Sequence, residues 1–252
     1  MKLAAMILVT VLCIGAAGRS ARGAETEPSA EQRDSDPIES VNRKIFWFND
    51  QVDIYVLEPI ATGYDTITPK PVQKSITNFF ENLRFPIVAS NNLLQGKVKS
   101  AASDVARFGV NTTVGVLGFF DPASHWGLEA HDEDFGQTLG FWGVPPGPYL
   151  VLPFLGASNP RDAVGLAVDS VAAVYPWFVD LQYTASAYTV RVVNARAQVL
   201  KEVAQAKGAA LDYYVLVRNA YRQHRQALVN DRAEMSKQEE EDLYQVEPEG
   251  SP

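Results

Sequence analysis

The sequence predicts an all-α protein, with a single domain of roughly eight mostly amphipathic helices over residues 36–230. Apolar residues recur every three or four positions in several segments, which is the spacing of one helix face. Capping residues followed by proline and an acid stand where several of these segments begin. No segment alternates apolar and polar residues as a half-buried strand does. With 46% hydrophobic residues among 252, the chain has enough apolar material for a sizeable core.

The first 23 residues have the features of a secretory signal peptide. Lys2 precedes an apolar run that is too short to span a membrane comfortably, and small residues follow it. Cys13 is the only cysteine, so no intramolecular disulfide is possible. The large Leu12 stands where lipid attachment needs a small residue before the cysteine, so we expect Cys13 not to be lipidated.

The remaining terminal segments are polar. Residues 24–35 predict a flexible arm, and residues 231–252 predict a disordered acidic tail. The net charge of −8 argues against a nucleic-acid partner, because such a partner presents negative phosphates. After the signal peptide, no apolar run reaches the ~18 residues of a membrane-spanning helix.

In the N-terminal half, the first helix is expected to start at Asp36-Pro-Ile-Glu39, which supplies a cap, a proline and an acid in order. Its apolar face consists of Val41, Ile45, Phe48, Val52 and Val56. Thr68-Pro-Lys-Pro71 predicts a second helix, and Phe85-Pro86 should end it because the residue before proline avoids the α conformation. A further helical piece over residues 87–95 would then be closed by Gly96.

Residues 97–108 predict the next helix. The residues expected to face inward are Val98, Ala101, Ala102, Val105 and Phe108. Asp121-Pro-Ala-Ser124 predicts a turn, and Asn159-Pro-Arg-Asp162 predicts the start of a helix that Pro176 ends. Trp177-Phe178-Val179 is an apolar, aromatic hairpin candidate.

Two helices are predicted near the C-terminus. The first covers residues 185–207 and is ended by Gly208, and the second is capped by Asp212 and covers residues 213–230.

The most distinctive stretch runs from Phe135 to Asp162 and is rich in glycine and proline. Residues 133–142 predict a short helix, with Gly143 just beyond it in the left-handed conformation. The Pro-Pro-Gly-Pro turn at 145–148 should reverse the chain into an apolar extended run over residues 149–155. On physical grounds alone, a buried connection in an ordinary helical domain accounts for this stretch equally well.

This stretch closely resembles the signature of the VacJ/MlaA lipoprotein family. That signature reads aromatic-Gly-x-Thr-Leu-Gly-x-aromatic-Gly-Val-x-x-Gly-Pro-Tyr-x-x-Leu-Pro-x-x-Gly followed by Arg-Asp, and each of these positions is matched here. Further resemblance lies in Asn42-Arg43 with Phe48-Asn49, in Asn92-Leu-Leu-Gln-Gly96, and in the spacing of Arg218, Tyr221 and Arg225. Together these motifs extend from about residue 36 to residue 229. Members of the family usually carry a lipidated cysteine at the end of the signal peptide, and the residues around Cys13 depart from that pattern.

The resemblance implies a non-enzymatic component of phospholipid trafficking at the bacterial outer membrane. Such a protein is exported and forms a helical ring in or on the inner leaflet, at the periplasmic side. Phospholipids misplaced in the outer leaflet would pass through its amphipathic channel to a periplasmic carrier, which maintains lipid asymmetry. The implied partners are phospholipids, the outer membrane, a trimeric porin and a soluble periplasmic lipid carrier.

Two residue sets follow from this implied role. The candidates for the lipid channel or its rim are Gly140, Gly143, Pro146, Gly147, Pro148, Tyr149 and Pro153. The candidates for seating the ring in the membrane are Val41, Ile45, Phe48, Val52 and Val56. The alternative for each apolar stripe is an ordinary place in the core, and the sequence does not separate the two for any single residue.

A search for catalytic motifs finds one suggestive cluster, His125 with His131-Asp-Glu-Asp134, whose imidazoles and carboxylates could hold a divalent metal. It lacks a fixed ligand spacing, and acids in a first helical turn have a simpler explanation in the helix dipole. We therefore expect no catalytic residue, metal ion or cofactor. The alternatives are a periplasmic metal-dependent lipid hydrolase and a structural or virulence-associated surface protein. Neither explains the extended central match.

Overall fold

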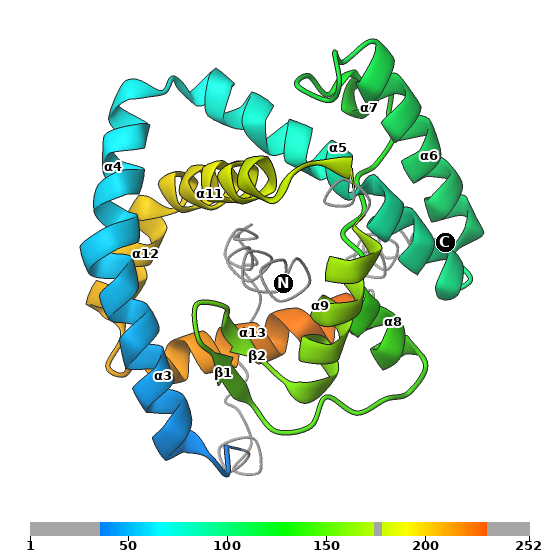
Figure 1. Ribbon diagram of the computed structural model, residues 1–252. Helices are drawn as coiled ribbons and strands as arrows, with labels where there is room; N and C mark the ends of the chain where they lie inside the picture. The colour runs from blue at the N-terminus through cyan, green and yellow to red at the C-terminus, as the bar shows by residue number, and fades with distance from the viewer. Residues whose placement is uncertain (1–35, 174–177, 231–252) are drawn as a thin grey trace, which may run out of the picture.

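The computed structural model describes residues 36–173 and 178–230, in which helices follow one another around a ring (Figure 1). A two-stranded β-hairpin is the only sheet in these two ranges. The prediction of an all-α fold class is confirmed. The predicted signal peptide with Cys13, the arm, the acidic tail, Pro176 and Trp177 lie outside the described residues.

The first side of the ring is a continuous helical rod. It consists of α3 (Glu39–Val52), the π-helical turn η2 (Asp53–Leu57) and α4 (Glu58–Ile67). The predicted cap at Asp36 is wrong, because Ile38 occupies the cap position. The Asp36 carboxylate instead accepts hydrogen bonds from Asn42 Nδ2, at 2.8 Å, and from the Tyr214 hydroxyl of the last helix. Asp36 therefore ties the chain ends of the ring together.

The next side is formed by one long helix, α5 (Lys70–Leu94), which runs through Pro86. The predicted helix end at Phe85-Pro86, and with it the separate helix over residues 87–95, is therefore wrong. Proline removes one backbone hydrogen bond, but the neighbouring helix α6 (Val98–Thr113) packs along α5, and the Phe85 ring stacks on Phe108 at 4.3 Å. Packing thus outweighs the local preference. Gly96 ends the helix with φ +77°, as predicted.

The inward face predicted for α6 is only partly correct. Ala101 is buried, whereas Val98 and Val105 are each more than half exposed. The chain continues through a short helix, α7 (Pro122–His125), capped by Asp121, to α8 (Phe135–Phe141). Gly143 follows α8 with φ +87°, which confirms the predicted left-handed position.

The predicted extended run is the first half of a hairpin. Strand β1 (Leu150–Leu152) pairs antiparallel with β2 (Gly156–Ser158), with Leu150 opposite Ser158. The second strand was not predicted, because three residues are too few to show an alternating pattern. The hairpin lies between α3 and the last helix and closes the ring (Figure 1).

Within residues 159–173 and 178–230, the longer helices are α9 (Pro160–Ala172), α11 (Leu181–Gln198), α12 (Leu200–Ala209) and α13 (Tyr213–Val229). The predicted caps Asn159 and Asp212 are confirmed, since their side chains accept hydrogen bonds from the amides of residues 162 and 215 at 2.9 and 3.2 Å. The hairpin predicted at 177–179 is wrong where the structure describes it, because residues 178 and 179 are not in a strand.

The single helix predicted over residues 185–207 is also wrong. It breaks at Val199, and Gly208 lies within α12 instead of ending it. The break gives each half its own contact with the first rod. Arg196 of α11 reaches Asp53 at 2.7 Å, and Lys207 of α12 reaches Asp50 at 2.7 Å.

Burial in this ring differs from that in an ordinary water-soluble domain, in which most buried side chains are apolar. Among the described residues, more polar or charged side chains than hydrophobic ones are buried, and the largest fully buried ones include Gln73, Gln137, Asn42 and Asn92. Large hydrophobic side chains are exposed on every side of the ring, Trp47 at 64% among them. No helix within the described ranges is long and apolar enough to cross a membrane.

Candidate functional site

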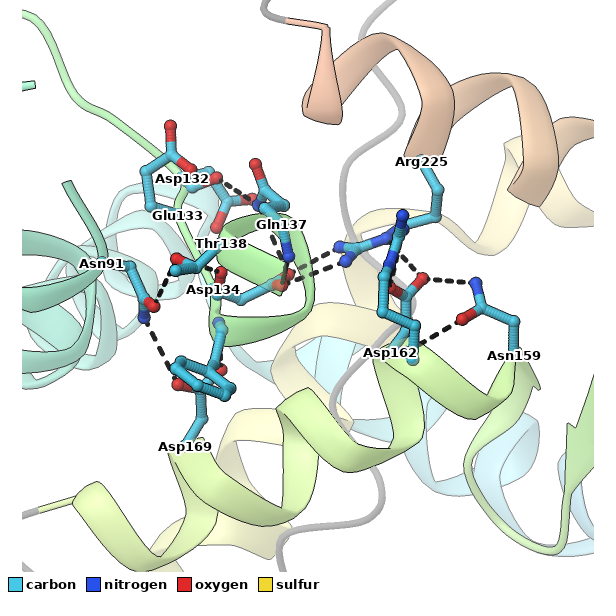
Figure 2. A network of polar contacts seen from close by, with 12 residues as sticks. Asn91, Asp132, Glu133, Asp134, Gln137, Thr138, Asn159, Asp162, Asp169 and Arg225 are labelled. Atoms are coloured by element: carbon cyan, nitrogen blue, oxygen red, sulfur yellow. Dashed lines mark hydrogen bonds and ion pairs between the residues drawn. The ribbon is translucent and has the colours of Figure 1, made fainter. Parts of the chain in front are cut away.

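The glycine- and proline-rich segment is held in place by a network of polar contacts around α8 (Figure 2). Asp134 caps α8 by accepting a hydrogen bond from the Gln137 amide at 2.8 Å. Arg225 of α13 donates to both oxygens of Asp134, at 2.6 and 3.0 Å. Burial by itself would raise the pKa of Asp134, but the hydrogen bonds and charge of Arg225 outweigh it and lower this pKa to about 2. Asp134 is therefore a carboxylate at neutral pH.

The same arginine also reaches α9. Its Nε donates to Asp162 Oδ2 at 2.8 Å, and that oxygen accepts further hydrogen bonds from Asn159 Nδ2 at 2.7 Å and the Tyr221 hydroxyl at 2.5 Å. Figure 2 shows Arg225 between the two carboxylates. The starts of α8 and α9 and the C-terminal half of α13 are thus joined by one charged group.

On the other side of α8, neutral groups connect it to α5. Thr138 Oγ1 donates to Asn91 Oδ1 at 2.7 Å, and Asn91 Nδ2 donates to Asp169 at 3.3 Å. Asp169 also accepts from the amide of Phe135 at 3.0 Å. Burial, together with the negative charge of Asp134, raises the pKa of Asp169 to about 6 although these hydrogen bonds oppose the shift.

Glycines allow α8 to approach its neighbours closely. A Cβ at Gly165 of α9 would lie 2.3 Å from the backbone nitrogen of Gly136, so the two backbones touch. A Cβ at Gly140 would lie 2.7 Å from Arg161 and 2.9 Å from Val229. Gly140, predicted at the channel or its rim, therefore serves close packing of α8 against α9 and α13.

The other rim candidates divide into two groups. Tyr149 is 1% exposed and forms the hairpin core with Val151 and Tyr214. The exposed candidates are Gly143, Pro146, Gly147, Pro148 and Pro153. Gly147 adopts φ +74°, where an L side chain is strained. A role of the exposed group in lining a lipid passage stays a prediction.

Two asparagines of α3 fasten the hairpin. Asn42 donates to the Tyr149 carbonyl and accepts from the Val151 amide, both at 2.9 Å. Asn49 donates to the Leu152 carbonyl at 2.9 Å and accepts from the Phe154 amide at 2.7 Å. A spacing of seven residues places both amides on one helix face. The sequence analysis includes both asparagines in a motif of the family resemblance but does not predict that they fasten the hairpin.

The membrane-seating candidates on α3 and η2 do not share one environment. Val41, Phe48 and Val56 are exposed, at 51%, 40% and 52%. Ile45 is partly buried and packs against the hairpin core, and Val52 is also partly buried. One part of the apolar face of α3 and η2 therefore packs against the rest of the protein, and the other part is exposed.

The two histidines of the suggestive cluster, His125 and His131, have separate partners. His131 Nδ1 lies 2.7 Å from Asp104 Oδ1, and His125 Nδ1 lies 3.2 Å from the carbonyl oxygen of Asp121. In residues 36–173 and 178–230, no group of three or more His, Cys, Asp or Glu side chains is arranged to hold a metal ion.

Comparison with known proteins gives consistent similarities. The model of the MlaA lipoprotein family matches residues 34–228. The chain is 37% identical over 230 residues to the intermembrane phospholipid transport system lipoprotein MlaA of Haemophilus influenzae, covering 89% of this chain and 90% of that protein. It is 32% identical over 234 residues to the protein of the same name from Escherichia coli K12, covering 91% and 89%.

A solved structure is similar as well. Its description reads "Structural basis for maintenance of bacterial outer membrane lipid asymmetry". The two structures match with a TM-score of 0.69 and 32% sequence identity, and the match covers 77% of this chain and 99% of the other.

Proposed function

The chain belongs to the MlaA lipoprotein family, and we propose that it carries out intermembrane phospholipid transport at the bacterial outer membrane. It removes phospholipids misplaced in the outer leaflet, passes them through an amphipathic channel to a periplasmic carrier and so maintains lipid asymmetry. It acts as a transport component and not as an enzyme.

The observation that carries this proposal is the burial pattern of the ring. Many large hydrophobic side chains are exposed, which suits contact with acyl chains, whereas many polar side chains are buried between the helices. A charged headgroup crossing hydrocarbon without polar partners meets a cost on the order of several kcal/mol. A polar passage through the ring lowers that cost and needs no chemical step.

The exposed part of the α3 and η2 face, Val41, Phe48 and Val56, seats the ring in the inner leaflet. An aspartate at Phe48 or at the partly buried Val52 should release the protein from membranes or abolish its function, whereas Phe48→Leu should do neither. Carbonate-washed membranes measure retention. Unchanged retention and intact lipid asymmetry in both aspartate variants would argue against the seating role.

The exposed glycines and prolines at 143–153 shape the channel or its rim. Two partners complete the route: a trimeric porin in the same membrane and a soluble lipid carrier in the periplasm. The first 23 residues are removed on export together with Cys13, so the mature chain starts near Ala24. Intact mass of the mature protein checks this point, and an acyl mass on Cys13 would contradict it.

Deletion of the gene tests the proposed function directly. Intact cells lacking it should expose more phosphatidylethanolamine to a membrane-impermeant amine reagent, and the wild-type gene on a plasmid should restore the low level. Equal labelling of deleted and wild-type cells would refute the transport role.

A further inference from the structure

A shallow hollow of about 460 Å³ lies on α3 and is lined by Arg43, Lys44, Trp47 and Phe48. We call it the α3 hollow. Its aromatic wall is extended by Phe154 of the hairpin turn, whose ring meets Phe48 edge-on at 5.3 Å. Phe154 adopts φ +63°, unusual for a residue with a side chain, and its amide donates to Asn49. The exposed aromatic wall is therefore held in a defined position.

Among the residues that line the α3 hollow, some polar groups have an ion-pair or hydrogen-bond partner and others have none among the described residues. Arg43 is paired with Glu39 at 2.6 Å and with Asp212 at 2.7 Å. Lys44 is exposed and has neither an ion pair nor a hydrogen bond to any of the described residues. The indole N–H of Trp47 likewise has no acceptor within the described part of the chain. The hollow is thus mainly apolar, and two of its lining residues, Lys44 and Trp47, carry a cation and a donor without a partner among the described residues, in a protein whose net charge is −8.

A ligand for this combination must supply a negatively charged acceptor and an apolar portion next to it. A phospholipid at the surface of a bilayer has both, in its phosphate and in the glycerol end of its acyl chains. Lysine attracts anionic headgroups near a membrane surface, and tryptophan favours the depth of the headgroups. We propose that the α3 hollow binds the headgroup of an anionic phospholipid, with Lys44 and Trp47 facing the phosphate.

This inference rests on the proposed function, because it requires the ring to lie at a membrane. It adds a fixed lipid, bound at the surface of α3, to the lipids that are transported. Such a lipid would set the depth and orientation of α3 in the leaflet.

Titration of purified mature protein with vesicles of phosphatidylethanolamine and phosphatidylglycerol tests the proposal. Lys44→Gln should weaken binding about five-fold, the effect of one basic residue near an anionic surface. The matched variant Lys99→Gln changes another exposed lysine, on α6, and should bind as wild type does. Phospholipids brominated near the headgroup should quench tryptophan fluorescence in wild type and clearly less in Trp47→Phe.

Three results would overturn the proposal: equal binding by the two lysine variants, unchanged quenching in Trp47→Phe, or displacement of Lys44-dependent binding by millimolar inorganic phosphate. The last would assign the hollow to free phosphate. If the wild-type protein bound no vesicles, both this proposal and the proposed function would be refuted. If Lys44→Gln bound vesicles as tightly as wild type, only the assignment of the α3 hollow would be refuted.

Discussion

Replacing Gly165 by alanine tests how closely α8 and α9 pack. The new Cβ would lie 2.3 Å from the backbone nitrogen and 2.6 Å from the Cα of Gly136, whereas ordinary contact begins at 3.4 Å. Both of these atoms belong to the backbone, so no side-chain rotation relieves the overlap. The start of α8 must move away from α9 by about 1 Å, a shift comparable to those that overpacked cores undergo.

The movement of α8 lowers the free energy of unfolding in two ways. Overpacking costs about 1–3 kcal/mol. The hydrogen bond from Phe135 to Asp169, 3.0 Å long, would also stretch beyond its range. Hydrogen bonds to charged groups contribute about 1.5–3 kcal/mol each. The two costs add to about 2.5–6 kcal/mol, and the better helix propensity of alanine returns about 0.5–1 kcal/mol, so we expect Gly165→Ala to lower the free energy of unfolding by at least about 1.5 kcal/mol.

Gly109 of α6 provides the matched control, because it is also inside a helix but no atom lies within 4 Å of the position that an added Cβ would take. Gly109→Ala should stabilise the protein by about 0.5–1 kcal/mol through helix propensity alone. Urea unfolding in mild detergent, followed by tryptophan fluorescence, measures both variants. If the two alanines changed stability in the same direction, the backbone contact between α8 and α9 would be refuted.

Further substitutions probe the polar network around α8 and the attachment of the hairpin to α3. The folded pKa of Asp169, about 6, exceeds its ordinary value of 3.8, so the folded state binds the proton more tightly and loses stability as pH rises through 6. Asp169→Asn removes this titration but also one acceptor, because an amide has a single oxygen for the two donors, Asn91 Nδ2 and the Phe135 amide. The lost acceptor costs the same at both pH values, so the stability of the variant relative to wild type should rise by about 2 kcal/mol between pH 4 and pH 7.5, as measured by unfolding at both. Arg225→Met, which leaves Asp134 without its counter-charge, should cost about 3 kcal/mol. Arg225→Lys should cost less, and equal stability of the two variants would contradict a charge role. Asn42→Ala strips two buried backbone groups of their partner and should cost about 2–4 kcal/mol, against about 1 kcal/mol for the more exposed Asn49→Ala, in the same unfolding measurement.

The sequence predicts which residues belong to the candidate site better than it predicts what each of them does. The signature segment with its short helix and Gly143 could be read locally, because a left-handed cap depends on only a few neighbouring residues. The role of Gly140 in packing could not, because it depends on Arg161 and Val229 from two other helices. The bond between Arg225 and Asp134 joins residues 91 positions apart, and no local pattern reports such a pair.

The sequence by itself determined the all-α class, the family resemblance and the caps at Asn159 and Asp212. Each of these depends on hydrogen bonds or periodicity within a few residues. Only the tertiary structure decided that α5 runs through Pro86 and that the predicted 185–207 helix breaks at Val199. Contacts between distant segments outweigh local preference at both places. Only the tertiary structure shows that many polar side chains are buried while large hydrophobic ones stay exposed, since the burial of a helix face depends on the neighbours that pack against it.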